Sequence, residues 1–165
     1  MPQGILTELD NISQSYENIY STGNKALDIT LTEKCRDFTQ HNINFAVIAD
    51  GSVISFMADV DVYVLFGNLI ENAKEAVLNI EDVNNRIIGV YLKRTDQFIS
   101  LHVENTVNEK PKFEDGLPVT NKSDKQNHGF GTKSIQFVVD KYQGTMSMDC
   151  DGNLFTVEIA FFAKE

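Results

Sequence analysis

The side chains best suited to chemistry lie in a helix that we predict over residues 59–80. At about 100° per residue, its apolar side chains form one face, and a polar stripe beside that face holds Asn68, Asn72, Glu75 and Asn79. Asparagine is a poor residue for a helix interior because its amide competes for backbone hydrogen bonds. An amide oxygen is a hard, neutral ligand that suits Mg²⁺ held otherwise by water and phosphate. The helix alone leaves open a solvated polar face or a magnesium site.

A second group of residues lies near position 130, directly before another predicted helix. It consists of His128, Gly129, Phe130, Gly131 and Thr132. Glycine lets the backbone approach an anion closely, and the N–H groups at a helix start favour phosphate. A P-loop is excluded, because its pattern requires glycines at positions 127 and 132. The glycine pair alone does not specify a ligand.

The elements that would position these residues alternate between helices and pairs of strands. A polar segment at 107–127 holds two of the three prolines and has no periodicity, which favours a lid or binding loop. Paired strands separated by helices indicate an α+β fold, a two-layer sandwich with a mostly antiparallel sheet and helices on one face. We predict helices at 5–20, 25–40, 59–80 and from Gly131 to Tyr142, and strands at 43–49, 52–56, 86–94, 98–106, 145–149 and 154–162.

Composition narrows the possible partners. The chain has 165 residues, enough for one domain, and a formal net charge of −10. A surface of this sign repels nucleic acid and anionic membranes. No apolar run is long enough to cross a bilayer and no signal-peptide pattern is present, so we expect a cytoplasmic domain with no membrane contact of its own. Cys35 and Cys150 lack metal-binding spacing, and we expect two reduced thiols.

The asparagine helix resembles a known motif. Its segment Asn68-Leu69-Ile70-Glu71-Asn72-Ala73 resembles the N-box of the GHKL (Bergerat-fold) ATPase superfamily, which includes gyrase B, MutL and the histidine kinases. The resemblance implies ATP and Mg²⁺ as cofactors, Asn72 as the metal ligand and Asn68 as its support. The gyrase and MutL branch has a hydrolytic glutamate at the position of Asn68. The resemblance thus implies the histidine kinase branch, in which Glu71 would help to activate the phosphoryl acceptor.

The glycine segment extends this resemblance. Thr120-Asn121-Lys122 followed by His128-Gly129-Phe130-Gly131 is similar to the peptide-pheromone receptor kinases. In that branch the residues corresponding to Lys122 and His128 would contact the ATP phosphates. The segment from Gly129 to Thr132 would form the box that closes over them.

The adenine site departs from the usual pattern of the superfamily. Most members carry D-x-G-x-G after the central strand pair, but this chain has Asn105 at the aspartate position and lacks both glycines. The Asn105 Oδ1 atom is still able to accept a hydrogen bond from the adenine amine.

The resemblance also divides the chain into two parts. Residues 1–22 resemble one helix of a dimerisation hairpin, and residues 23–165 a catalytic domain with a lid at about 107–128. None of the three histidines has the phosphoacceptor pattern. The resemblance therefore implies a separate phosphoacceptor domain and a response regulator as partners, and leaves open a homodimeric, membrane-anchored parent. Two alternatives remain: a non-catalytic GHKL interaction module and an anti-sigma-type protein-serine kinase.

Overall fold

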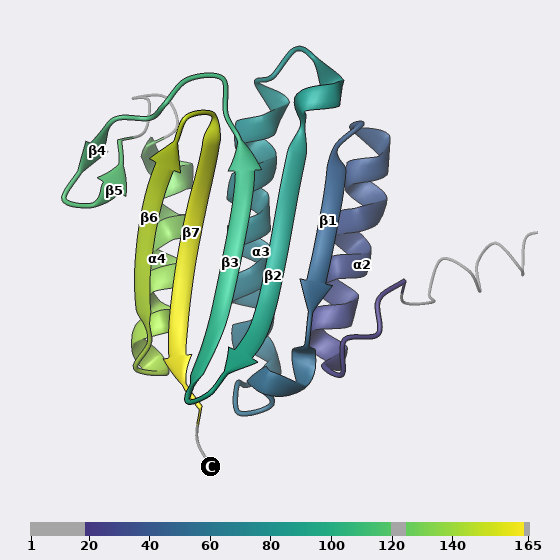
Figure 1. Ribbon diagram of the computed structural model, residues 1–165, viewed down its shortest axis with the longest axis vertical. Coiled ribbons are helices and arrows are strands. Elements are labelled where there is room, and N and C mark those ends of the chain that lie inside the picture. Colours follow the sequence, from purple (N-terminus) through teal and green to yellow (C-terminus); the bar gives the residue numbers. More distant parts are fainter. Residues whose placement is uncertain (1–18, 120–124, 164–165) are drawn as a thin grey trace, which may run out of the picture.

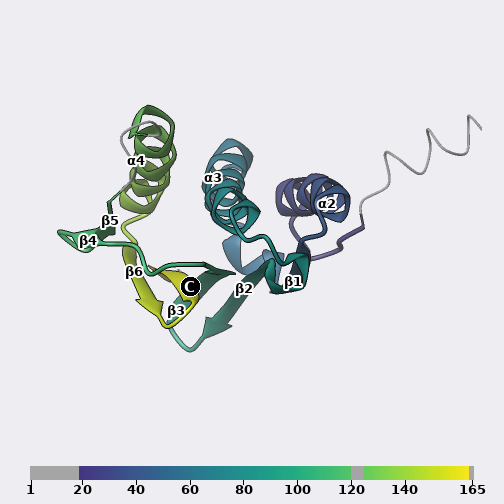
Figure 2. The same ribbon diagram turned by 90° about the horizontal axis from the view of Figure 1, so that it is seen from above.

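Three helices cover one face of a five-stranded sheet in the computed structural model, which describes residues 19–119 and 125–163 (Figures 1 and 2). Side chains are described for residues 19–119 and 131–163. The helices are α2 (Lys25–Gln40), α3 (Asp59–Leu78) and α4 (Lys125–Lys141). The strands of the sheet are β1 (Asn44–Ala49), β2 (Ile87–Thr95), β3 (Phe98–Thr106), β6 (Thr145–Asp151) and β7 (Leu154–Phe162).

The strand order is β1-β2-β3-β7-β6. β1 and β2 are parallel, and every other neighbouring pair is antiparallel. Because side chains alternate between the two faces of a strand, Ile99, Leu101, Val103 and Asn105 of β3 share the buried, helix-facing side. This arrangement confirms the predicted α+β sandwich. None of the helices in the described residues is long and apolar enough to cross a membrane.

The predicted strand at 52–56 is wrong. Residues Gly51–Ile54 form a short 3-10 helix, η1, because the Asp50 carboxylate accepts hydrogen bonds from the Ser52 N–H and hydroxyl. Gly51 packs so closely under the segment before α2 that a Cβ atom there would lie 2.7 Å from the Asn24 Cβ. The chain is thus held in a turn, and β1 pairs with the distant β2 instead of forming a hairpin.

The start of α4 also differs from the prediction. The helix begins at Lys125, so both Gly129 and Gly131 lie within it. The segment before it is not wholly irregular, since β4 (Phe113–Glu114) and β5 (Leu117–Pro118) form a small hairpin beside β6 and α4 (Figure 1). The Phe113 ring stacks on Phe155 of β7, with centroids 6.2 Å apart. This contact attaches the first half of the predicted lid to the sheet.

The N-terminal helix predicted over 5–20 lies largely outside the described residues, and the assignment of residues 1–22 remains a prediction. Ile19 and Tyr20 are described and are not helical. The Ile19 N–H donates to the Thr32 hydroxyl at 3.0 Å, and the Tyr20 ring meets Phe45 edge-on. The chain therefore reaches α2 through a segment that is bound to the domain. Cys35 and Cys150 are both free thiols, as predicted.

Candidate functional site

The first two residues of the α3 polar stripe, Asn68 and Asn72, face α4. A Cβ atom added to Gly131 of α4 would lie 3.2 Å from Asn72 Oδ1 and 3.5 Å from Asn68 Oδ1. At the other end of the helix pair, Lys141 Nζ lies 2.8 Å from Asp61 Oδ2. The two helices are therefore antiparallel, and both asparagines are half-buried between them rather than fully solvated. The structure thus brings Asn68 and Asn72 together with Gly131, which lies in a helix far along the chain.

The chemistry at this contact is that of two amide oxygens beside a glycine backbone. The Asn68 Nδ2 group donates to the Val64 carbonyl at 2.7 Å, which fixes the amide with its Oδ1 atom toward Gly131. Mg²⁺ binds oxygen ligands and usually keeps waters or phosphate oxygens as well, so this pair of oxygens fits it. Among the described residues, no group of three or more histidine, cysteine or carboxylate side chains could hold a metal ion.

Asn105 lies at the end of β3, on the same side of the sheet as the helices, and is only 4% exposed. Its Nδ2 group donates to the Thr106 carbonyl at 3.0 Å. This bond uses the donor end of the amide and leaves Oδ1 as an acceptor. Just beyond β3, Asn108 Nδ2 donates to the Asn79 carbonyl at 2.7 Å, which ties the start of the predicted lid to the C-terminal end of α3.

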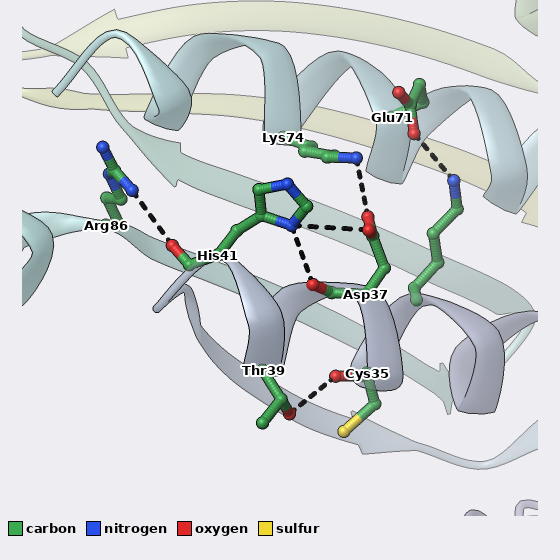
Figure 3. Close-up of polar contacts among 8 residues, drawn as sticks. Cys35, Asp37, Thr39, His41, Glu71, Lys74 and Arg86 are labelled. Atoms are coloured by element: carbon green, nitrogen blue, oxygen red, sulfur yellow. Dashed lines mark hydrogen bonds and ion pairs between the residues drawn. The ribbon is translucent and has the colours of Figure 1, made fainter.

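Glu71 lies on a different side of α3 and faces α2. Its Oε2 atom pairs with Lys34 Nζ at 2.8 Å, and one turn further on Lys74 pairs with Asp37 at 2.7 Å (Figure 3). The hydrogen bond from Lys74 holds the pKa of the Asp37 carboxyl below its usual value. His41 also contacts Asp37, through the backbone carbonyl at 2.9 Å. The structure therefore places Glu71 in an ionic seam between helices and does not bring it to Gly131.

The structure describes the remaining predicted site residues only in part. Lys122 lies outside the described residues. His128, Gly129 and Phe130 lie in the first turns of α4, where side chains are not described. Thr132 follows Gly131 in α4 and is half-buried. Their roles in binding phosphate remain predictions.

Comparison with known proteins places the chain in a family. Residues 57–162 match the GHKL domain, which is more than half of the chain. The chain belongs to the GHKL domain family. The match runs from just before α3 to the end of β7 and includes Asn68, Asn72, Asn105 and Gly131.

Solved structures share the fold of this GHKL domain. A nucleotide-free structure of the catalytic domain of the histidine kinase ThkA has a TM-score of 0.64 at 15% identity, covering 89% of this chain and 96% of that one. A second ThkA structure has a TM-score of 0.62 at 14% identity, and the match covers 89% of this chain and 97% of that one. The Acinetobacter baumannii histidine kinase AdeS has a TM-score of 0.56 at 11% identity, and the match covers 99% of this chain and 79% of that one. A comparison with curated protein sequences finds no match.

The GHKL domain also contains a buried carboxylate with charged and polar partners that the sequence did not reveal. Asp61 at the start of α3 is 6% exposed and accepts hydrogen bonds from Lys141 and from the Tyr142 hydroxyl. These bonds hold the pKa of the Asp61 carboxyl below its usual value, and the bond from Lys141 has the larger effect. One signal was present: on a helical wheel, Asp61 falls on the same stripe as Asn68, two turns earlier. Its partners lie 80 and 81 residues away, which no local pattern indicates.

Proposed function

We propose that this GHKL domain is the ATP-binding catalytic domain of a two-component sensor histidine kinase. It would act in the cytoplasm and transfer the γ-phosphoryl group of ATP to a histidine of a phosphoacceptor domain, which in turn would serve a response regulator. The contact of Gly131 with the amide oxygens of Asn68 and Asn72 carries the proposal. The resemblance to the N-box and to the phosphate-closing box assigns metal and phosphate binding to these same residues.

The roles of the residues follow from the demands of phosphoryl transfer, which are mainly positioning and charge neutralisation. Mg²⁺, when bound, would neutralise charge on the phosphate oxygens. Asn72 would bind that ion through Oδ1, and Asn68 would support Asn72 in this position. The absence of a side chain at Gly131 would let the α4 backbone approach the phosphates. Lys122 and His128, as the resemblance implies, would add positive charge.

Asn105 would bind the base. Its Oδ1 atom is an acceptor because Nδ2 is engaged by the Thr106 carbonyl, so it matches the amine of adenine. The start of the predicted lid is tied to Asn79 at the C-terminal end of α3. The base would therefore lie toward this end of α3 and the phosphates toward Asn72 and Gly131.

Asparagine at position 68 favours transfer over hydrolysis, because an amide cannot accept a proton from water as a carboxylate does. The overall charge of −10 also requires that phosphate be held locally. Amide-bound Mg²⁺ and the free N–H groups in the first turn of α4 would meet that requirement without a basic surface.

A second candidate is a GHKL module that binds no nucleotide. The absence of both glycines of the D-x-G-x-G motif after Asn105 favours it. A measurement of nucleotide binding by the isolated chain distinguishes the two functions.

Calorimetric titration with ATP and ADP, with and without Mg²⁺, tests the proposal. We expect the wild-type chain to bind both nucleotides more tightly with Mg²⁺, and Asn72→Ala to lose at least about tenfold in affinity only when Mg²⁺ is present. Asn44→Ala, at an exposed position of β1, is the control and should bind normally. Absence of binding by the wild type at millimolar nucleotide would favour the second candidate. Normal Mg²⁺-dependent binding by Asn72→Ala would refute the metal assignment.

A further inference from the structure

A polar cluster around one buried carboxylate joins the N-terminal end of α3 to the C-terminal end of α4, with Lys141 exposed at its edge. Lys141 Nζ lies 2.8 Å from Asp61 Oδ2, and the Tyr142 hydroxyl donates to the same oxygen. The Tyr142 oxygen in turn accepts the Ala58 N–H at 2.9 Å. We name Asp61, Lys141 and Tyr142 the helix latch. Asp61 is nearly inaccessible to solvent, so its carboxylate depends on these partners.

The helix latch and the asparagine–glycine contact lie at matched positions along the helix pair. Asn72 follows Asp61 by eleven positions, and Lys141 follows Gly131 by ten. At 1.5 Å per residue these spans are about 16.5 Å and about 15 Å. The two helices are therefore fastened at one end by the latch and meet at the other end through Gly131. A change in spacing at the latch would be carried along α4 to Asn72.

The contact at Gly131 is sensitive to such a change. The gap between the Gly131 backbone and the Asn72 amide is so small that one methyl group would lie 3.2 Å from Oδ1. Phosphoryl transfer depends on positioning, and shifts of about 1 Å are costly. α4 also holds the segment that the family resemblance assigns to the phosphates.

We propose that Asp61, Lys141 and Tyr142 are positioning residues of the nucleotide site, which act by fixing α4 on α3 so that Gly131 stays against Asn72. This inference rests on the proposed function, since it concerns the same site. The latch residues do not touch the nucleotide. They set the fraction of molecules in which the site is assembled before nucleotide binds. Variants that loosen the latch lower this fraction, and the apparent affinity falls in proportion to it.

Tyr142→Phe is the mildest test. The Tyr142 ring packs edge-on against Phe56, with centroids 5.6 Å apart, so removal of the hydroxyl leaves the apolar packing in place. Tyr91→Phe is the matched control, because the Tyr91 hydroxyl also donates to a carboxylate, Glu104, at 3.3 Å on the other face of the sheet. A second pair, Asp61→Asn with Asp37→Asn as control, compares two interhelical ion pairs on opposite sides of α3.

Two quantities are measured for each variant. One is the affinity for ADP with Mg²⁺, and the other is the rate of hydrogen exchange at the amides of residues 131–141. We expect the latch variants to bind about tenfold more weakly and to exchange faster in α4. We expect both controls to match the wild type in affinity, and any faster exchange that they cause to be spread over the domain rather than concentrated in α4. If Asp61→Asn does not fold, Tyr142→Phe and its control decide the question.

The outcomes separate this inference from the proposed function. A wild-type chain that binds ADP, together with latch variants that bind it equally well, would overturn the inference alone. Equal weakening in the latch variants and the controls would also overturn it, because the effect would then be one of general stability. A wild-type chain that binds no ADP would refute the proposed function and the inference with it.

Discussion

At the scale of single residues, the site depends on an absent side chain. Gly131 lies within α4, where alanine is the better helix former by about 1 kcal/mol, yet its backbone lies against the amides of Asn72 and Asn68. Helix propensity favours a side chain at this position, whereas a Cβ atom there would lie 3.2 Å from Asn72 Oδ1 and would require that amide to shift. The conflict between the two is typical of a functional position.

Gly131→Ala should therefore weaken nucleotide binding without unfolding the domain. The added methyl group would displace the Asn72 amide, and we expect a loss of about tenfold in affinity for ADP with Mg²⁺. The free energy of unfolding should change by less than about 1 kcal/mol, because the gain in helix propensity offsets the close contact. Calorimetry and urea denaturation measure the two effects.

Gly67→Ala is the matched control, since it also lies within a helix but an added Cβ atom meets nothing within 4 Å. It should increase stability by up to about 1 kcal/mol and leave affinity unchanged. Equal affinities for Gly131→Ala and the wild type would show that the Gly131 contact plays no part in binding.

Asn105 should determine which base is bound. Its amide is oriented by the Thr106 carbonyl, so Oδ1 accepts from the amine of adenine but meets the carbonyl oxygen of guanine, with which it forms no hydrogen bond. We expect the wild type to prefer ADP over GDP by more than about tenfold and Asn105→Ala to lose most of this preference. Competition titrations measure the ratio. A preference that survives in Asn105→Ala would place base recognition elsewhere.

At the scale of elements, two ion-paired carboxylates fasten α3 to its neighbouring helices. Hydrogen bonds from Lys74 and from Lys141 hold the pKa values of Asp37 and Asp61, respectively, below the ordinary 3.8. The unfolded chain therefore takes up these protons first as the pH falls. The stability that the two carboxylates contribute is fully present above the unfolded value and is lost as the pH falls through the folded values.

We accordingly expect the free energy of unfolding to decline below about pH 4. The decline should be smaller in Asp37→Asn and in Asp61→Asn, and smallest in the double variant. Urea denaturation between pH 7 and pH 3 measures these slopes. A double variant with the wild-type acid slope would show that other groups control acid stability.

Elements with a clear period were predictable from sequence. The apolar face of α3 predicted that helix locally. The structure adds that the Asn24 side chain caps α2 by accepting the Leu27 N–H at 3.0 Å. The segment 52–56 was mispredicted because its conformation is set by the Asp50 carboxylate and by the chain packed over Gly51. The start of α4 was mispredicted because the glycines favour a loop, and tertiary packing against α3 overrides that preference.

At the scale of the whole molecule, paired strands and intervening helices were enough to predict the α+β sandwich. The parallel pairing of β1 with β2 was not predictable, because it joins segments separated by the whole of α3. The candidate site was likewise predictable only in part. Asn68 and Asn72 were predictable from one helix, whereas their contact with Gly131 and the helix latch depend on how α4 lies in the folded chain.

The most direct test of the account is to map the residues that respond when ADP and Mg²⁺ are added to the isotopically labelled chain, using nuclear magnetic resonance. We predict shifts in the side-chain amides of Asn68, Asn72 and Asn105 and in the backbone amide of Gly131. We also predict that the signals around the pocket of about 390 Å³ beside Arg94, on another part of the surface, stay unchanged. Shifts confined to that pocket, with the asparagine amides unmoved, would contradict a nucleotide site between α3 and α4.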